Sequence, residues 1–552
     1  MGASQRSDAA MSQPPNSRQA IAANDVLVGS YFLETLTTGM YENPFHCVRE
    51  YVQNGFDAVQ EAVRSGLMKA DEGRILITVG ASSRAPSLKI RDNGCGLAAS
   101  DAAKTLTALG ASRKSRVSDA GFRGIGRLAG IAYCTTLVFT TSQRGEPTAT
   151  QVSFDCGLIR SYFAPGAEPV DVREVIRSSV SVSTLPASEE DHYTEVDMLK
   201  LVNLGTEFTD PERLEPYLRE VCPVDYRDAF EFGERVRSLA SSFGNPLPTV
   251  YVETKHKRER NAVLKPYAMT YSAGRSLSKL HDIETFSSPE LGWFGWLGVS
   301  NFPGELTDDT VAGVRFRVKN IQVGNEDLIK AMAEDLTPSG SERRLMTWAV
   351  GEIFITNTSV VPNARRDGFE DNAEWRKVRE NIRELVGRRV VKLVRSASTT
   401  RGAVKKISEA AKSVERALSS ESVTSQDKVE IEEAIQTHLK TLSSRAKLTG
   451  ADPKQISALT ARFKELSELL KDKPIQEPKD DGEPDDETET TEPGLGDDDN
   501  GDIKEDGEDT SPGTLPDPRL SLIVEVLRAE LAEDKARQLA AQIIERLDAL
   551  PE

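Results

Sequence analysis

The chain of 552 residues is poor in the features that mark secreted and membrane proteins. It has only five cysteines, with no CxxC pair, and no apolar run approaches the 18 residues of a membrane span. The amino-terminal stretch is polar and has no signal-peptide pattern. We therefore expect a soluble protein of a reducing compartment, the cytoplasm, without a membrane partner.

Two common nucleotide signatures are also missing. No Gly-Lys pair occurs anywhere in the chain, which excludes a Walker-type phosphate loop, and the order of glycines in GFRGIG does not fit a dinucleotide fingerprint. Of the five histidines, only His438 lies in a long helical stretch of the last third of the chain, and it lacks the Glu and Pro context of a phosphoacceptor helix. A sensor histidine kinase is therefore a poor fit.

The acidity of the chain is local. The net charge is −18, but residues 476–517 alone hold 18 acidic and 2 basic residues, a net charge of −16. This stretch is rich in Pro and Gly and nearly devoid of apolar side chains, which is typical of a disordered linker. The remaining chain is close to neutral, so the overall charge says nothing about the surface of the folded part.

The most informative segment of the chain is REYVQNGFDAVQEA. At about 100° per residue, Glu50, Asn54 and Asp57 fall on one face of a helix, opposite an apolar face. Asn43 is a plausible N-cap before Pro44, and Gly66 is a plausible stop, so we expect a helix over residues 44–65. Such a polar face is either a solvated surface or a site.

Three further segments follow in order. SLKIRDNGCGL is a short strand that ends in Asp92 and a turn with Gly94 and Gly96, where a carboxylate can accept a hydrogen bond from an exocyclic amine such as that of adenine. AGFRGIGRLAG is a glycine-rich loop before an apolar helical run, which suits phosphate oxygens. We read the third, GTEF, as the start of a strand whose Thr206 hydroxyl supports Asp92.

Together these four segments resemble the nucleotide site of the ATPase superfamily that joins DNA gyrase, heat-shock protein 90, sensor histidine kinases and MutL. The resemblance covers roughly residues 28–210. The stretch YENPFHCVREYVQNGFDA is most similar to the heat-shock-protein-90 branch, where Asn and Asp follow the Glu by four and seven residues. The resemblance implies a Bergerat-fold ATPase that uses ATP and Mg²⁺.

The resemblance also implies roles for individual residues. Glu50 is the candidate base for the attacking water, and Asn54 is the candidate Mg²⁺ ligand. Arg49 restrains Glu50 or is an ordinary surface Arg, and Asp57 supports the adenine side or a water network, or forms a helix-surface ion pair. The candidate nucleotide-binding residues are Asn54, Asp57, Asp92, Gly94, Gly96, Ser112, Lys114, Gly121, Gly124, Ile125, Gly126 and Thr206.

Residues 104–120, rich in small, polar and basic side chains, have the composition of a mobile lid. By resemblance this lid closes over ATP, with Ser112 and Lys114 offered to the phosphates; the alternative is a basic surface loop. Further on, strands are predicted within residues 313–324 and 348–369. The second ends near Arg365 and Arg366, the candidates for a middle-domain cation that touches the γ-phosphate.

We expect an α+β protein with an N-terminal α/β sandwich ATPase domain, a β-α-β middle domain and a C-terminal helical region. Amphipathic patterns predict the helices of that region within residues 374–394, 427–442 and 454–470. The expected boundaries are a disordered N-terminus (1–27), the ATP-binding domain (28–215), the middle domain (216–380), a helical bundle or coiled coil (381–473), a disordered acidic linker (474–517) and C-terminal amphipathic helices (518–552).

The functional hypothesis is an ATP-driven conformational clamp. In the first reading the clamp is chaperone-like, closes its lid, forms a homodimer and acts on client proteins. In the second it is a MutL-like or gyrase-like module of a DNA repair or defence assembly, for which the near-neutral charge of the folded part offers little support. A scaffold that binds ATP without turnover is a third reading, against which the presence of Glu50 argues.

Overall fold

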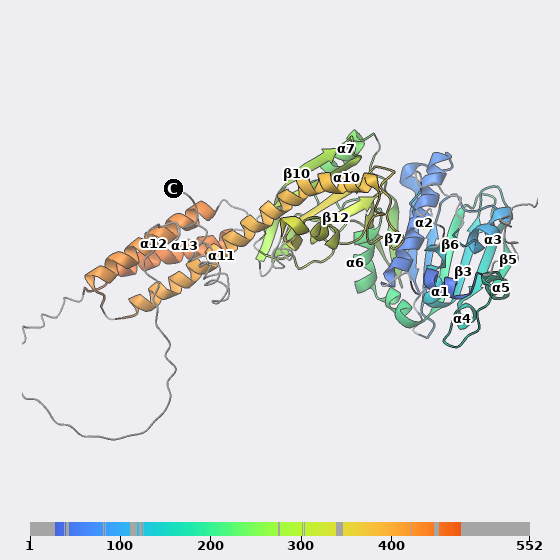
Figure 1. Cartoon of the computed structure of the whole chain (residues 1–552), viewed down its shortest axis with the longest axis horizontal. Helices are drawn as coiled ribbons and strands as arrows, with labels where there is room; N and C mark the ends of the chain where they lie inside the picture. Colours follow the sequence, from blue (N-terminus) through green and yellow to red (C-terminus); the bar gives the residue numbers. More distant parts are fainter. Residues whose placement is uncertain are drawn as a thin grey trace, which may run out of the picture. The chain divides into compact units, whose positions relative to one another are not determined.

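The computed structural model describes residues 28–475, with gaps at 38, 40–42, 81, 83, 111–118, 121–123, 125, 245, 274–275, 301, 303, 338–345, 421 and 447–451. It contains two sheets and a group of long helices, so the chain is of the expected α+β class (Figure 1). The N-terminus predicted for residues 1–27 and the C-terminal helices predicted for residues 518–552 lie outside the described residues, as does the acidic linker predicted for residues 474–517 from residue 476 onward. Among the described helices, none is both long and apolar enough to cross a lipid bilayer.

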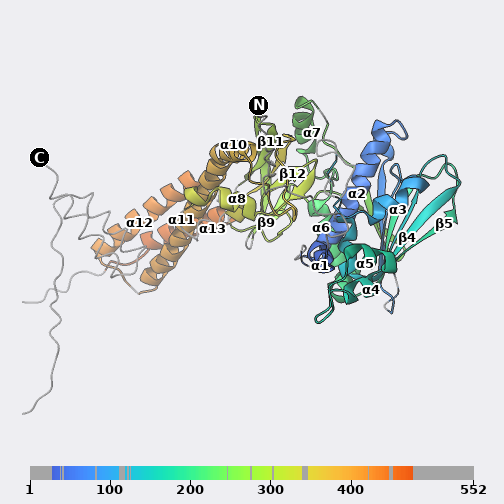
Figure 2. The ribbon, with the colours of Figure 1, turned by 45° about the vertical axis from the view of Figure 1, so that its right-hand side comes forward.

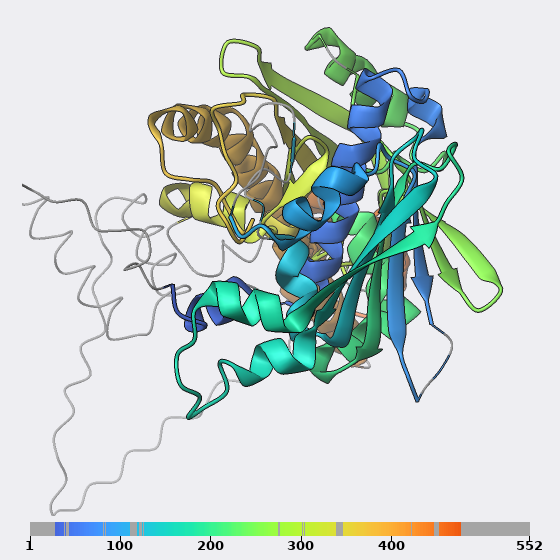
Figure 3. The same ribbon diagram turned by 90° about the vertical axis from the view of Figure 1, so that its right-hand side faces the viewer.

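The first sheet has eight strands in the order β5-β4-β3-β6-β2-β1-β7-β8. Its strands are β1 (Arg74–Val79), β2 (Ser87–Asp92), β3 (Cys134–Ser142), β4 (Thr148–Asp155), β5 (Val180–Pro186), β6 (Tyr193–Leu201), β7 (Tyr251–His256) and β8 (Glu259–Val263). The accompanying helices are α1 (Tyr31–Thr37), α2 (Phe45–Arg64), η2 (Ala70–Glu72), α3 (Ala99–Thr107), η3 (Gly126–Ala132), α4 (Cys156–Ser161), α5 (Val172–Ser179), η4 (Asn203–Thr209) and α6 (Pro211–Val221), whereas α7 (Gly233–Ser242) packs on the second sheet. Helix α2 lies along one face of the first sheet (Figure 3).

The hairpin β7–β8 places part of the expected middle domain in the first sheet. Strand β7 pairs in parallel with β1, from Arg74 opposite Tyr251 to Val79 opposite His256, and β8 pairs antiparallel with β7. Helix α6 also runs across the boundary that we expected at residue 215. That boundary is therefore misplaced, because sheet pairing between residues distant in sequence leaves no mark on local composition.

The second sheet has six strands in the order β13-β12-β14-β11-β10-β9. They are β9 (Thr270–Ala273), β10 (Ser276–Ser288), β11 (Trp293–Ser300), β12 (Gly313–Val318), β13 (Ile321–Val323) and β14 (Val350–Ile355), with α8 (Asp327–Met332), η5 (Glu334–Leu336), η6 (Met346–Trp348) and α10 (Ala373–Ile382) nearby. Strands β12, β13 and β14 occur where the sequence predicts strands. All six residues of β14 are buried, as expected for a strand covered on both faces.

The helix predicted within residues 374–394 is present as α10, a π-helical turn η7 (Arg383–Gly387) and the start of α11 (Arg388–Leu418). The helices predicted within residues 427–442 and 454–470 are present as α12 (Ser425–Arg445) and α13 (Pro453–Lys471). The expected boundary at residue 380 falls inside a helix. Helix α10 and the first half of α11 pack on the second sheet through an apolar stripe that includes Trp375 and Val394. The bundle core, with α12 and α13, begins only at Val404 (Figure 2).

A buried charge cluster lies beneath the second sheet's β12–β13 turn. The carboxylate of Glu352 accepts hydrogen bonds from Lys265 Nζ at 2.8 Å and Trp296 Nε1 at 3.0 Å, and it also binds Arg317 and the Tyr226 hydroxyl. Although burial alone raises the pKa of Glu352, the adjacent Lys265 and Arg317 hold it at about 2. The carboxylate is therefore a fixed anion that anchors the strands around it.

Candidate functional site

Helix α2 begins and ends within one residue of its prediction. The Asn43 side chain accepts a hydrogen bond from Phe45 N at 2.9 Å, Pro44 is the N-cap, and Gly66 has a φ of +74° just past the end. Its apolar face packs in the core of the first sheet. The polar face is not a solvated surface, because Glu50 and Asp57 are only 8% and 3% exposed.

Glu50 lies between two guanidinium groups. Arg49 Nη2 is 3.4 Å and Arg366 Nε is 3.5 Å from Glu50 Oε1. Arg49 Nη2 also donates to the Arg365 carbonyl at 3.2 Å, and the side chain of Arg49 is buried, so it is not an ordinary surface Arg. The structure thus brings Arg365, in the segment that follows β14, to Arg49 on the helix that carries Glu50, and the two arginines are 316 positions apart in the sequence.

The two arginines after β14 differ in their placement. Arg366 is buried, and its Nη2 donates to the Ala120 carbonyl, whereas the side chain of Arg365 is exposed. Arg366 also has a φ of +60°, a left-handed conformation that residues other than glycine adopt at a cost. Backbone strain of this kind persists only where surrounding contacts fix it, as they do here.

The glycine-rich loop touches Glu50 at its last glycine. A Cβ on Gly126 would lie 2.3 Å from Glu50 Oε2, so any side chain at this position would force the carboxylate to move. Gly124 precedes it with a φ of +71°. The sequence pattern therefore has a concrete steric basis: the loop approaches the carboxylate of the candidate base through its backbone.

Asp92 ends β2 with its carboxylate buried. Its Oδ1 accepts from Gly94 N at 2.8 Å and from Thr194 N at 3.4 Å. A Cβ on Gly94 would meet the backbone of Ala58 at 2.5 Å, so this turn packs directly on α2. Gly96, with a φ of +64°, would meet the Ser142 carbonyl in the same way.

The expected role of Thr206 is not supported by its position. Residues 203–209 form the 3₁₀ helix η4 and not the start of a strand, and the exposed Thr206 donates its hydroxyl to the Asn203 carbonyl at 3.0 Å. Thr194 on β6 lies opposite Asp92 instead, and its hydroxyl is 3.2 Å from that of Thr141. The alternation in YTEVDML marks this strand and was the available signal.

Asp57 contacts the last residue of the expected lid, Ala120. Its Oδ1 accepts from Ala120 N at 2.8 Å, and Arg64 on the same helix lies 3.7 Å from Asp119. Because Asp57 is buried, the alternative of a helix-surface ion pair does not fit, and its role on the adenine side or in a water network stays a prediction. Asn54 is half-buried on the face shared with Glu50. Ser112, Lys114, Gly121 and Ile125 lie outside the described residues.

These residues fit an adenine nucleotide by their chemistry. Asp92 is an acceptor at a turn that is clear of side chains, and the backbone of the glycine-rich loop lies beside Glu50. In the described part of the chain, no group of three or more His, Cys, Asp or Glu side chains could hold a metal. Any divalent cation here would therefore need ligands from the nucleotide phosphates, with a neutral oxygen such as that of Asn54.

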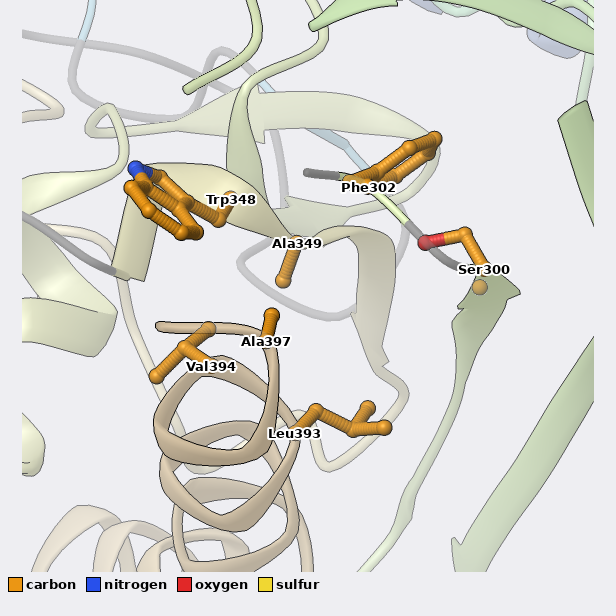
Figure 4. A pocket seen from close by; sticks show the side chains of 8 residues that line it. Ser300, Phe302, Trp348, Ala349, Leu393, Val394 and Ala397 are labelled. Carbon is orange, nitrogen blue, oxygen red and sulfur yellow. The ribbon is translucent and has the colours of Figure 1, made fainter. Parts of the chain in front are cut away.

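A small apolar pocket lies elsewhere, between the second sheet and α11 (Figure 4). Ala349 faces Val394 and Ala397 across it, and Trp348 and Phe302 stand at its sides. None of its lining residues belongs to the four motifs, so it plays no part in the candidate site.

Comparison with known proteins shows which family the first part of the chain resembles. Residues 41–161 match the family described as histidine kinase-, DNA gyrase B- and HSP90-like ATPase. The DNA mismatch repair protein MutL of Heliobacterium modesticaldum (strain ATCC 51547 / Ice1) is 34% identical over 134 residues, 23% of this chain and 18% of that protein. MutL of Aeromonas salmonicida (strain A449) is 26% identical over 252 residues, 44% and 36% of the respective chains.

The chain thus spans well under half the length of these relatives. The matched residues 41–161 hold Glu50, Asn54, Asp92 and the glycine-rich loop, the same residues that the structure gathers around α2. Both lines of evidence agree on the superfamily but do not single out the heat-shock-protein-90 branch. The chain carries an ATPase domain of the histidine kinase, DNA gyrase B and HSP90-like superfamily, with MutL proteins among its relatives.

Proposed function

We propose that this chain hydrolyses ATP at Glu50 and that turnover depends on Arg366 docking beside that residue. The observation that carries the proposal is the Glu50 carboxylate lying between Arg49 and Arg366 and against Gly126. A base, a cation and a glycine-rich backbone around one buried point form a set suited to phosphoryl transfer to water.

The chemistry assigned to these residues is simple. Glu50 accepts a proton from a water molecule as that water's oxygen bonds to the γ-phosphorus, and the bond to the bridging oxygen breaks so that ADP leaves. Arg366 neutralises charge on the transferred group, and Arg49 holds the carboxylate in place. Asp92 accepts from the adenine amine, and Asn54 offers an oxygen ligand to Mg²⁺, which supplies charge neutralisation on the phosphates when bound.

The first test replaces the base. Glu50→Gln keeps the shape of the side chain, and we expect turnover to fall by about 10²- to 10⁴-fold, with ATP binding retained. Glu61→Gln is the matched control. Glu61 lies on the same helix, but its side chain is exposed and forms a salt bridge with Arg64, three residues further along. Steady-state hydrolysis and nucleotide binding are measured in parallel, and equal turnover in both variants would refute the assignment.

A second test separates the two arginines. We expect Arg366→Ala to lower turnover while leaving ATP binding nearly intact, because its guanidinium faces Glu50. Arg365→Ala is expected to have the smaller effect, because the contact from residue 365 to Arg49 uses its backbone carbonyl. An unchanged rate of ATP hydrolysis in Arg366→Ala would contradict the proposal that the segment after β14 contributes a cation to the site.

The partner of this ATPase is proposed to be a DNA repair assembly. The sequence alone put a chaperone-like clamp first, but both relatives are DNA mismatch repair proteins, which favours the MutL-like alternative. The test is ATP turnover with and without linear duplex DNA at about 50 and 200 mM salt, where a phosphate-binding protein loses DNA affinity steeply. ATP turnover that DNA stimulates at low salt but not at high salt would support this reading. Suppression of client aggregation, without stimulation of ATP turnover by DNA, would favour the chaperone reading.

Homodimerisation belongs to the same proposal. An ATPase that closes around a substrate gains from pairing two copies when nucleotide is bound, and MutL-like relatives make this the natural expectation. Sedimentation of Glu50→Gln with and without saturating ATP tests it, because bound nucleotide then persists. A monomer under both conditions would contradict this part.

A further inference from the structure

Helix α11 is strongly basic in a chain that is acidic overall. Its residues 388–418 contain nine Lys or Arg and two Glu, a net charge of +7, whereas the whole chain has a net charge of −18. The neighbouring helices are close to neutral, with a net charge of −1 on α12 (three basic, four acidic) and +2 on α13 (four basic, two acidic). The near-neutral total of the folded part therefore conceals one cationic helix.

The basic side chains lie on the side of α11 that faces solvent. The helix extends from the second sheet into the bundle (Figure 2), and it packs through its apolar side, with Val394 in the first part and Ile407 in the second. Eight of the nine basic residues are exposed, and Arg389 is half-buried. At about 100° per residue, the eight exposed residues form two rows, each within about 60° of arc. The first row is Arg388, Lys392, Arg395 and Lys406, and the second is Arg401, Lys405, Lys412 and Arg416.

Few of these cations are neutralised by carboxylates. Arg388 Nε lies 2.6 Å from Glu384 Oε2, and Lys405 Nζ reaches Glu409 Oε1 only at 4.0 Å. Within the described residues, no salt bridge reaches Lys392, Arg401, Lys406, Lys412 and Arg416. Five positive charges on this side of the helix therefore face solvent without a carboxylate partner in that part of the chain.

The charge pattern costs the helix stability. Lys392 follows Arg388 by four residues and precedes Arg395 by three, and Lys405 adjoins Lys406. Like charges three or four residues apart repel each other and destabilise a helix. The apolar side of α11, and not these cations, holds the helix in place. A set of cations that the fold does not require indicates an anionic partner.

We propose that the exposed side of α11 binds the phosphate backbone of duplex DNA. From Lys392 to Arg416 the helix rises by about 36 Å, at about 1.5 Å per residue, which is close to the length of one turn of B-DNA. Gly402 lies between the two rows of cations, and Ser398 and Ser413 stand at their inner edges. Each row can therefore face one strand of the duplex, while the two hydroxyls donate to phosphate oxygens.

The composition of α11 favours duplex DNA over other anionic partners. The helix has no aromatic residue, and none of its large apolar side chains is exposed. Single-stranded nucleic acid is bound by stacking of its bases on aromatic side chains, and a membrane-surface helix needs an exposed apolar face. The proposal rests on the DNA-linked reading of the proposed function, and it locates the DNA on a surface that shares no residue with the ATP site.

The test is binding of a fluorescent duplex of about 30 base pairs to the full-length protein, followed by anisotropy without nucleotide between about 50 and 200 mM salt. A triple variant, Lys392→Gln with Lys406→Gln and Lys412→Gln, removes three exposed charges from the two rows. The control variant removes the same charge from α12 and α13 by replacing three exposed lysines with Gln. These are Lys440, Lys454 and Lys464. The two variants then differ only in where the charge is lost.

The expected result follows from the release of counterions. Each phosphate contact contributes about −0.9 to the slope of log K against log salt, so the slope of the α11 variant should be shallower by about 2.7. At about 0.1 M salt this corresponds to binding that is weaker by about 10²- to 10³-fold. The control variant, and a variant with Arg at the same three positions of α11, should bind like the wild type. Glu409→Gln should strengthen binding, because Glu409 is the acidic residue between the two rows.

Two results would overturn the inference. One is equal binding by the α11 variant and the control variant, and the other is a wild type that binds no duplex at about 50 mM salt. Tighter binding to a single strand of the same length, or to anionic vesicles, would replace duplex DNA as the partner. The α11 variant should melt no lower than the wild type, because like-charge neighbours have been removed.

The proposed ATPase function is decided separately. The binding assay contains no nucleotide, so its outcome does not depend on turnover. A wild type that binds the duplex but does not hydrolyse ATP would refute the proposed function and leave the role of α11 standing. Loss of duplex binding in the α11 variant with wild-type basal ATP hydrolysis would support the inference.

Discussion

Gly126→Ala offers a steric test of the candidate base. The added Cβ would lie 2.3 Å from Glu50 Oε2, where an ordinary contact is at least 3.4 Å, so the carboxylate must move by about 1 Å. A displacement of about 1 Å at a catalytic group costs on the order of 10² in rate. Because the carboxylate is confined between Arg49 and Arg366, we also expect about 1–3 kcal/mol of destabilisation from overpacking.

The assay is a double-mutant cycle on kcat. Glu50→Asp shortens the side chain by one methylene and makes room for the new Cβ, so Gly126→Ala should cost much less in that background. Gly157→Ala is the control within the same domain, since its nearest atom, Asp155 Oδ1, would be 3.3 Å away. Full turnover in Gly126→Ala, or strict additivity with Glu50→Asp, would refute the placement of Glu50 as the base beside this loop.

Three further predictions follow from single sites. Asp92→Asn should weaken ATP binding about 10- to 100-fold in calorimetry, with little change in melting temperature, because its acceptor for the adenine amine is lost; unchanged affinity would argue against the adenine contact. Glu352→Gln should destabilise the protein by about 3–5 kcal/mol in urea unfolding, since Lys265 and Arg317 then remain buried without their anion. Gly402→Ala, in α11 with open space around it, should stabilise by about 1 kcal/mol, and a loss would indicate a hidden contact there.

The sequence predicts local features of this site well. Pro44 and Gly66 predict the ends of α2 to within one residue, because the residues at a helix terminus themselves determine where the helix begins and ends. The pattern of apolar and turn residues also predicted β2, which ends in Asp92, as well as β12 and β14.

What the sequence could not supply was long-range contact. The polar face of α2 looked suited to solvent, yet Glu50 is buried because Arg366, over 300 residues away, packs beside it. Thr206 stands in a Gly-Thr pair, which is a local signal, whereas the position of Thr194 opposite Asp92 follows only from the pairing of β6 with β2.

The pairing of β7 with β1 determines how this protein can be divided for experiments. A fragment that stops near residue 215, the boundary suggested by the motifs, would lack both strands of the hairpin and leave one edge of β1 unpaired along its length, although β2 still pairs with the other edge. Such a fragment would invite strand-to-strand association and soluble aggregates, whatever its affinity for nucleotide. During synthesis, too, the nucleotide-binding sheet stays incomplete until residue 263 has emerged, so the ATPase core cannot finish folding before part of its neighbour has been made.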